Sequence, residues 1–235
     1  MLRVEKLEGG YKDFKVLHNV NFKVERGSIT CLLGPNGSGK STTLNTIMGL
    51  LKPWNGIVEF DGTGIAGKPP HEIAKLGISL VPEGRGIFGD MTVFENLEMG
   101  AYIKQTRKKF RDSVERVYSL FPVLKQRKNQ KAASLSGGEQ SMLVIARALI
   151  SNPKMLMLDE PSLGLAPKIA QELLNVVKKL QKDEGLTVLL VEQSIYLAGK
   201  VMDRGYVLSG GVTLAEGVFE ELIDNPIVRK AYLGL

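Results

Sequence analysis

The sequence has little cysteine and no long apolar run, and each of these shortages excludes a class of protein. Cys31 is the only cysteine, which excludes a disulfide framework and leaves no plausible thiolate metal site. No segment approaches the roughly 18 consecutive apolar residues that a membrane span requires. The first residues, 1–6, lack the apolar core of a secretory signal. Together these features predict a protein of the cytoplasm.

The composition is otherwise ordinary for a globular chain, with 43% hydrophobic and 24% charged residues. The formal net charge is +6, and much of the positive charge lies in residues 104–111 and 125–131. The solvated face of a helix and the loop after it account for these clusters most simply, although an anionic membrane surface would also attract them. Nucleic-acid binding is not expected, because neither stacking aromatics nor a helix-turn-helix or zinc pattern accompanies the charge.

The most informative segment is a glycine-rich loop between an apolar run and a helical pattern. It fits G-x-x-x-x-G-K-[ST] and comprises Gly34, Pro35, Asn36, Gly37, Ser38, Gly39, Lys40, Ser41 and Thr42. Backbone N–H groups of such a loop surround phosphate oxygens, and the N-terminus of the following helix adds partial positive charge. Lys40 would reach the β- and γ-phosphates, and the Ser41 hydroxyl would bind Mg²⁺. The segment therefore predicts binding of a nucleoside triphosphate.

A second motif is the apolar run at residues 155–158, which ends in two adjacent carboxylates, Asp159 and Glu160. Adjacent strand residues point in different directions, so the two side chains can have different roles. Asp159 can hold Mg²⁺ or its water, while Glu160 faces the attacking water and orients or deprotonates it. An acidic pair that is only solvated or caps the next helix is the alternative, and the phosphate loop upstream makes it the weaker one.

The order of patterns predicts an α/β fold. Short apolar runs at residues 29–33, 78–81, 154–158 and 186–191 alternate with helical patterns such as 135–151 and 169–184, which indicates a mainly parallel sheet covered by helices. Residues 2–7, 20–24 and 56–60 alternate polar and apolar side chains, as in an antiparallel sheet. We therefore expect one domain, 1–235, with a P-loop NTPase core, an N-terminal antiparallel β subdomain and an inserted α-helical subdomain at about 84–150. Residues 217–235 read as a helix start followed by a packing tail.

A third motif, Leu135-Ser136-Gly137-Gly138-Glu139, directly precedes a strong helical pattern. Two glycines at a helix start allow close approach of a ligand, and the helix N-terminus favours an anion. Together with the two nucleotide motifs, this segment resembles that of ATP-binding cassette proteins, and the resemblance covers essentially the whole chain. It implies that Ser136, Gly137 and Gly138 bind the γ-phosphate of ATP held by the opposite subunit of a dimer, and that Glu139 belongs to the segment that contacts this ATP.

The same resemblance assigns further residues and shows where this chain departs from the family. Tyr11 is similar to the aromatic residue that stacks on adenine, and Val16 to the small apolar residue beside it. Glu83 stands where the family usually has a glutamine that contacts Mg²⁺ and the attacking water. Gln193 stands in place of the histidine that contacts the γ-phosphate, and Ala166 replaces an aspartate in the loop after Glu160. These departures bear on the rate and symmetry of hydrolysis.

Further motifs resemble one ATPase subunit of the branched-chain amino-acid importers of prokaryotes. They are Val-Pro-Glu-Gly-Arg at 81–85, Glu-Pro-Ser-Leu-Gly-Leu-Ala-Pro at 160–167, Val-Glu-Gln at 191–193 and the terminal Arg-Lys-Ala-Tyr-Leu-Gly. The resemblance implies ATP and Mg²⁺ as cofactors, a second and different ATPase subunit, two membrane permeases, an extracytoplasmic solute-binding protein, and a peripheral location on the cytoplasmic face of the inner membrane. A homodimer is the other possibility for the isolated chain.

Other functions remain open from the sequence. Related subunits serve urea and amide importers, and exporter subunits share the same nucleotide motifs. A cassette ATPase of DNA repair, translation or cluster assembly would share them as well, although those of repair and translation usually carry two cassettes or large insertions. A non-hydrolysing scaffold would fit the changes at Glu83, Ala166 and Gln193. Intact Lys40, Asp159 and Glu160 argue against it.

Overall fold

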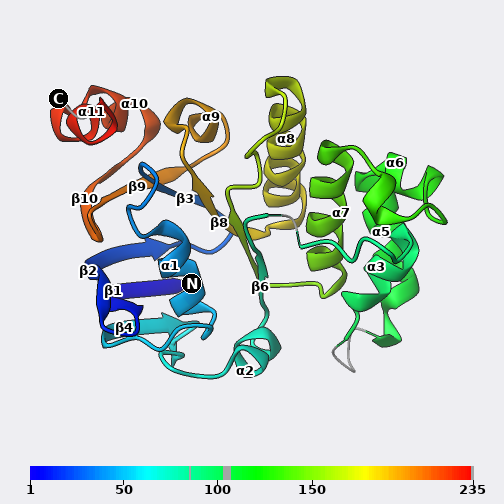
Figure 1. The fold of residues 1–235 in the computed structure, drawn as a ribbon, viewed down its shortest axis with the longest axis horizontal. Helices are drawn as coiled ribbons and strands as arrows, with labels where there is room; N and C mark the ends of the chain where they lie inside the picture. Colours follow the sequence, from blue (N-terminus) through cyan, green and yellow to red (C-terminus); the bar gives the residue numbers. More distant parts are fainter. Residues whose placement is uncertain (85, 103–106, 234–235) are drawn as a thin grey trace.

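The computed structural model describes residues 1–84, 86–102 and 107–233, and its main feature is a single sheet whose strands lie in the order β5-β4-β1-β2-β10-β9-β3-β8-β7-β6. Arg85 of the 81–85 motif, residues 104–106 of the first basic cluster and Gly234 of the terminal motif lie outside the described residues. Helices pack on both faces of the sheet (Figure 1).

The core of the sheet is parallel, as the sequence predicts. β3 (Ile29–Leu33), β8 (Thr187–Glu192), β7 (Met155–Asp159) and β6 (Ile78–Val81) pair in this order, all in parallel register. Every residue of β3, β7 and β8 is buried, because helices cover both faces, and this explains the continuous apolar runs. β7 and β8 each begin and end one residue later than predicted, so that Asp159 and Glu192 are the last residues of their strands.

The flanking strands form the predicted antiparallel part. β1 (Leu2–Tyr11) pairs with β2 (Phe14–Val24) and with β4 (Asn55–Phe60), which in turn pairs with the short β5 (Thr63–Gly64). Two strands that the sequence analysis does not assign, β9 (Arg204–Ser209) and β10 (Val212–Gly217), connect the two parts: β10 pairs with β2, and β9 pairs with β3. The expected α/β fold class is confirmed.

The helices belong to two groups around the sheet. α1 (Lys40–Ile47) packs on one face, where Leu44 and Ile47 meet apolar residues of β3, β7 and β8. α7 (Gly137–Ile150) and α8 (Pro167–Glu184) pack on the other face. The remaining helices are α2 (Pro70–Lys75), α3 (Val93–Met99), α5 (Phe110–Leu120), α6 (Pro122–Gln126), the 3₁₀ turn η1 (Ala132–Ser134) and α9 (Ile195–Gly199).

Beyond α7, on the side away from the sheet, lie α3, α5 and α6, and each of them contacts α7 (Figure 1). They occupy the range in which the sequence predicts a helical insertion, and a subdomain with bounds near 84–150 stays a prediction.

The C-terminal segment differs from the sequence prediction, which is a helix start followed by a packing tail at residues 217–235. It forms two helices, α10 (Phe219–Asp224) and α11 (Pro226–Leu233), because Pro226 begins a new helix immediately after Asn225. Both pack at the side of the sheet that carries β9 and β10 (Figure 1). Within the described ranges, the structure contains no helix that is long and apolar enough to cross a membrane.

Candidate active site

The phosphate loop connects β3 to α1 and presents the N-terminus of this helix. Gly39 precedes Lys40, the first helical residue, with φ of +102°, and a Cβ atom there would lie 2.8 Å from the Leu17 side chain. Only glycine fits both conditions. No side chain caps the first turn of α1, so its backbone N–H groups stay available for an anion. The loop therefore has the local geometry of a phosphate site.

Lys40 is buried at the centre of this loop. Its Nζ donates to the carbonyl oxygens of Gly34 and Pro35 at 2.9 and 3.0 Å and lies 3.2 Å from Glu160 Oε1. The ammonium group is held by the loop itself and by one carboxylate. Phosphate oxygens can replace these partners, because they accept stronger, charge-assisted hydrogen bonds than carbonyl groups do.

A hydroxyl group and a cluster of carboxylates meet beside Lys40. Ser41 Oγ donates to Asp159 Oδ1 at 3.1 Å. Burial raises the pKa of Asp159 to about 6, the charges of Glu160 and Glu83 act in the same direction, and Ser41 and Lys40 oppose them. Hydroxyl and carboxylate oxygens are the ligands that Mg²⁺ prefers, and a cation would neutralise the gathered negative charge. The residues present therefore fit a magnesium ion.

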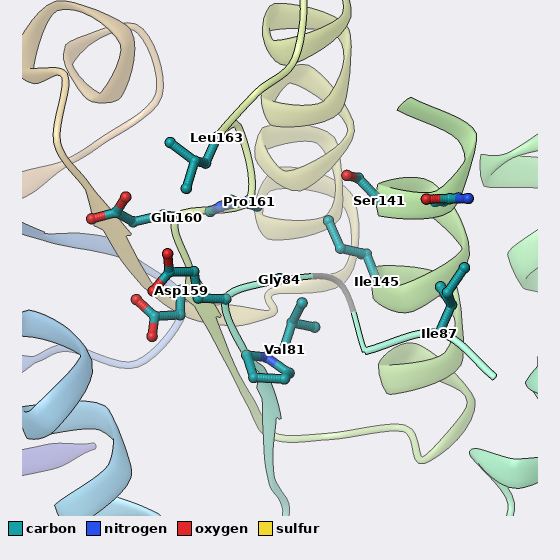
Figure 2. A pocket seen from close by; sticks show the side chains of 12 residues that line it. Val81, Gly84, Ile87, Ser141, Ile145, Asp159, Glu160, Pro161 and Leu163 are labelled. Atoms are coloured by element: carbon teal, nitrogen blue, oxygen red, sulfur yellow. The ribbon is translucent and has the colours of Figure 1, made fainter. Parts of the chain in front are cut away.

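Glu160 directly follows β7 and has an unusual backbone. Its φ is +47°, a left-handed value that is uncommon for a residue other than glycine, and its N–H donates to the Val191 carbonyl at 3.0 Å. Strained backbone of this kind often occurs at functional sites. Figure 2 shows the carboxylates of Asp159 and Glu160 extending from the end of β7 to the same side of a cavity that Leu163 also lines. The structure brings this predicted pair together with the phosphate loop.

Two aromatic residues line the phosphate-loop groove. Tyr11 and Phe14 lie opposite each other at the end of the β1–β2 hairpin, and they line a groove of about 520 Å³ together with Val16. This volume lies within the range of small-ligand pockets. The other lining residues come from the loop, α1 and the carboxylate cluster: Asn36, Gly37, Gly39, Lys40, Ser41, Thr42, Glu83, Glu160 and Leu163.

Phe14 is absent from the sequence predictions. It is 72% exposed although it is a large apolar residue, and its side chain is thus available to a ligand. The spacing Tyr11-x-x-Phe14 was the signal: a two-residue turn between strands places the flanking residues opposite each other.

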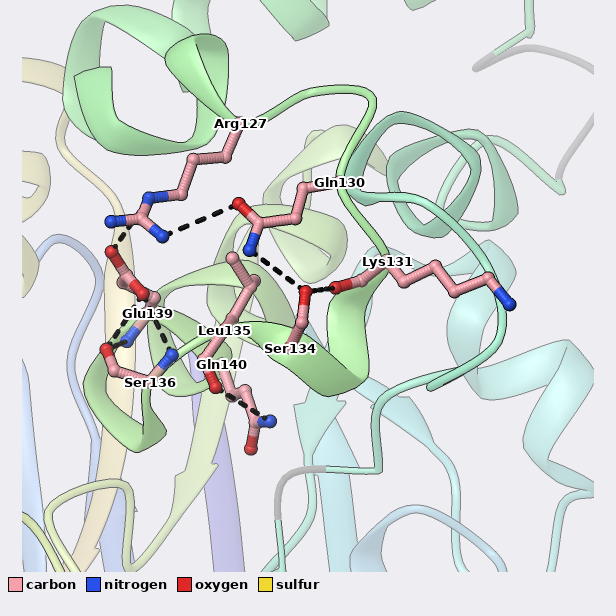
Figure 3. A network of polar contacts seen from close by, with 8 residues as sticks. All are labelled: Arg127, Gln130, Lys131, Ser134, Leu135, Ser136, Glu139 and Gln140. Carbon is pink, nitrogen blue, oxygen red and sulfur yellow. Dashed lines mark hydrogen bonds and ion pairs between the residues drawn. The ribbon is translucent and has the colours of Figure 1, made fainter.

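The segment Ser136–Glu139 lies at the start of α7 and lines none of the cavities described above. Ser136 caps the helix: its Oγ and N–H donate to Glu139 Oε2 at 2.9 Å, and the Glu139 N–H donates back to Ser136 Oγ. Figure 3 shows this capping pair and the ion pair between Glu139 and Arg127 at 3.1 Å. Gly137 and Gly138 form the first turn of α7. The structure thus does not join this segment to the chain's own phosphate loop.

The three departures from the family pattern lie on different segments. Glu83 lines the groove beside Glu160. Gln193 follows β8 and is exposed, and within the described part of the chain its side chain has no hydrogen-bond partner. Ala166 holds the N-cap position of α8, where it provides no side-chain cap. An aspartate at this position would cap the helix.

A buried amide, also missed in the sequence, holds the segment that follows Glu83. Asn96 in α3 is 0% exposed, and it accepts from the Phe88 N–H at 3.0 Å while its Nδ2 donates to the Phe88 and Thr92 carbonyls. Arg147 of α7 donates to Asn96 Oδ1 and to the Gly86 carbonyl and stacks on the Phe88 ring. These contacts fix residues 86–92 against α3 and α7.

Comparisons with known proteins agree with this geometry. A sequence-family profile described as ABC transporter matches residues 17–163. The chain is 44% identical to the high-affinity branched-chain amino acid transport ATP-binding protein BraG of Pseudomonas aeruginosa over the full length of both, and 39% identical to the probable branched-chain amino acid transport ATP-binding protein LivF of Archaeoglobus fulgidus, covering 100% of this chain and 99% of LivF.

Among solved structures, a nucleotide-free ATP-binding cassette from an ABC transporter superposes with a TM-score of 0.89 at 31% identity, covering 100% of this chain and 99% of that one. The resemblance inferred from the motifs is thereby confirmed, and with it the expectation of a nucleotide-binding ATPase domain. The chain belongs to the ATPase family of ABC transporters.

Proposed function

We propose that this chain hydrolyses ATP as one of two ATPase subunits of an importer of branched-chain amino acids. The observation that carries the proposal is the convergence of Lys40, Ser41, Asp159 and Glu160 at one groove that Tyr11 and Phe14 flank. The names of BraG and LivF, which are similar over their whole length, support the solute class.

In the proposed mechanism, the groove binds ATP with its base at Tyr11 and its phosphates in the loop. Lys40 exchanges the Gly34 and Pro35 carbonyls for phosphate oxygens. Ser41, Asp159 and Glu83 would hold Mg²⁺, which neutralises charge on the β- and γ-phosphates when bound. Release of Lys40 from Glu160 frees this carboxylate to orient a water and accept its proton.

The assembly follows from the position of Ser136–Glu139. Because this segment lies apart from the chain's own loop, a second ATPase subunit would present its equivalent to this groove, and the segment here would reach the partner's ATP. We propose the second subunit to be a different chain that carries a histidine at the position of Gln193. Two permeases, with an extracytoplasmic solute-binding protein, would complete the transporter, and the chain would lie on the cytoplasmic face of the inner membrane.

Glu160→Gln tests the catalytic part of the proposal. The amide keeps the shape of the side chain but cannot accept a proton, so MgATP binding is retained while turnover falls by about 10²–10⁴-fold, the range for loss of a general base. The matched control is Glu172→Gln, an exposed carboxylate on α8, which leaves turnover unchanged. Normal phosphate release by the Glu160 variant would remove this residue from catalysis.

Affinity capture of the tagged chain from detergent-solubilised membranes of its own cell tests the assembly. Recovery of two multi-spanning permeases and a histidine-bearing cassette ATPase supports the importer, and uptake assays with leucine, valine and urea then identify the solute class. Recovery of soluble partners alone, or uptake of urea but not of leucine or valine, contradicts it.

A further inference from the structure

Glu192, the last residue of β8, is a buried carboxylate that the hydrolysis mechanism does not use. It is 3% exposed, and one oxygen, Oε2, accepts from Ser162 Oγ at 2.9 Å. The other oxygen, Oε1, is buried and has no hydrogen-bond partner among the described residues. Such an atom is rare in native proteins and calls for a partner.

The direction of the Glu192 side chain follows from the strand register. Leu190 and Glu192 lie on one face of β8, and Leu33, which pairs with Glu192, lies on the same face of β3. Leu190 and Leu33 belong to the apolar cluster against which Tyr232 of α11 packs. Glu192 therefore points toward the side of the sheet that the C-terminal helix covers.

The hydroxyl group of Tyr232 is the second unpaired polar atom of this region. It is buried, and among the described residues no group has the geometry of a hydrogen bond to it, although the Gly34 backbone lies nearby. Burial raises the pKa of Tyr232, the charges of Cys31, Glu160 and Glu192 act in the same direction, and the Gly34 backbone opposes them. Gly34, whose backbone acts on this hydroxyl, directly follows Leu33, the register partner of Glu192, and the charge of Glu192 also acts on Tyr232. The hydroxyl and the Glu192 carboxylate therefore lie in the same region, at the carboxyl ends of β3 and β8.

We propose that Tyr232 is a positioning residue for ATP hydrolysis: its hydroxyl donates, directly or through one water, to Glu192 Oε1 and so completes a buried chain from α11 through Glu192 to Ser162. The two atoms are complementary, since the phenol has a proton to donate and the carboxylate has an oxygen that lacks a donor. A single buried water commonly bridges such a pair when they are slightly too far apart for a direct bond.

This series of hydrogen bonds ends at Ser162, beside the proposed reacting groups. Ser162 lies two residues after Glu160, and the Glu160 N–H is bonded to the Val191 carbonyl, one residue before Glu192. Gln193 directly follows Glu192. Fixing Glu192 therefore fixes the backbone of Glu160 from one side and the start of the Gln193 segment from the other. The inference rests on the proposed ATPase function of this site.

Tyr232→Phe in the full chain tests the inference, because it removes only the hydroxyl. We expect kcat for ATP to fall about two- to tenfold, the effect of one hydrogen bond, with KM for ATP unchanged. Tyr118→Phe is the matched control: the Tyr118 hydroxyl is also buried and has no partner in the part of the chain that the structure describes, but it lies in α5, on the far side of α7 from the sheet. It leaves kcat unchanged. Thermal unfolding of both variants verifies that they fold.

A double-mutant cycle with Glu192→Gln shows whether Tyr232 and Glu192 act through one series of hydrogen bonds or affect activity independently. If the two residues act through one series of hydrogen bonds, the double variant loses no more activity than the more impaired single variant. If they act independently, the two losses multiply. Unchanged kcat in Tyr232→Phe, an equal loss in Tyr118→Phe, or multiplying losses would each overturn the inference. Each of these outcomes is measured relative to an active wild-type protein. Failure of the proposed function would look different, because the wild-type protein itself would then release no phosphate.

Discussion

At the residue scale, the groove proposed to bind the nucleotide base is flanked by two aromatic side chains of one hairpin. Tyr11 is 48% and Phe14 is 72% exposed, and both line the groove that contains the phosphate loop. The Tyr11 hydroxyl lies 3.5 Å from Thr42 Oγ1 and is thereby oriented toward α1, while Phe14 has no polar atom to restrain it. We therefore expect Phe14 to adapt to the bound base and Tyr11 to provide a fixed surface.

Phe14→Ala is predicted to weaken ATP binding about two- to tenfold, because an aromatic contact contributes about 0.5–1.5 kcal/mol beyond its area. Binding of inorganic triphosphate, which has no base, is unchanged. Calorimetric titration of both ligands measures the difference. The control is Tyr102→Ala, an aromatic residue that is 78% exposed and lies outside the groove. Equal weakening of ATP and triphosphate binding would show that Phe14 only supports the loop.

Glu192 is predicted to make stability depend on pH. Burial raises its pKa from 4.5 to about 7, the charge of Glu160 acts in the same direction, and hydrogen bonds from Ser162 and the Gln193 backbone oppose this. The folded chain then binds the proton more tightly than the unfolded chain. The stabilisation is complete below about pH 4.5 and is lost as pH rises to about 7, and at about 1.4 kcal/mol per pKa unit it amounts to about 3 kcal/mol.

Urea unfolding of the wild type and of Glu192→Gln between pH 4.5 and 8 measures this dependence. The free energy of unfolding of the wild type falls relative to that of the variant as pH rises through about 7, and the difference levels off near pH 8. Glu172→Gln, an exposed position, follows the wild type at every pH. Parallel curves for wild type and Glu192→Gln would show that Glu192 is ionised throughout.

At the element scale, α3 and the segment before it behave as one unit because of Asn96. This side chain satisfies both the N–H and the carbonyl of Phe88 and has a further bond from Arg147. Asn96→Ala removes the acceptor of the Phe88 N–H, whereas the Phe88 carbonyl still accepts from the Met91 N–H at 3.1 Å, so the expected loss of unfolding free energy is about 0.5–1.5 kcal/mol, the contribution of one hydrogen bond. The Phe88 amide then exchanges its hydrogen faster. Asn129→Ala, an exposed amide, is the control, and equal exchange in both variants would contradict the assignment.

The elements also show which features can be predicted from sequence. Strands β3, β7 and β8 are predictable because burial on both faces requires a continuous apolar run, and the phosphate loop because its glycines are fixed by backbone geometry. β6, which lies at the edge of the sheet and is partly exposed, also has a short run that is mostly apolar. β9 and β10 are less evident, because their role is to pair with strands that are distant in the sequence. The same reason applies to Tyr232, whose surroundings are formed by residues near 33 and 192.

At the scale of the whole molecule, the groove forms one part of the proposed ATP site. Its walls are the hairpin, the loop and the ends of β6 and β7, and Ser136–Glu139 lies apart from it on α7. The side of a bound phosphate that faces away from the phosphate loop would thus be exposed to solvent. A second subunit closes this side in the proposed assembly, so that nucleotide binding and association of the subunits become coupled.

Ser136→Ala tests this coupling in the Glu160→Gln chain, which retains its ATP. Without its different partner subunit, the Glu160→Gln chain is expected to form a homodimer with MgATP that has the same arrangement. Ser136→Ala is expected to weaken this homodimer about ten- to a hundredfold, because a hydrogen bond to a charged group contributes about 1.5–3 kcal/mol. Sedimentation over a range of protein concentrations measures the dissociation constant. Loss of the helix cap is a separate effect of the same substitution, and it needs its own control.

Thr92→Ala is that control, because Thr92 caps α3 with the same reciprocal bonds to Glu95 that Ser136 makes to Glu139. Both substitutions remove one cap, and each is expected to lower the unfolding free energy by about 1 kcal/mol. Only Ser136 belongs to the segment that is proposed to reach the partner's phosphate. If Thr92→Ala weakens the dimer as much as Ser136→Ala does, capping alone explains the loss. A selective effect of Ser136→Ala places its hydroxyl at the ATP of the opposite subunit.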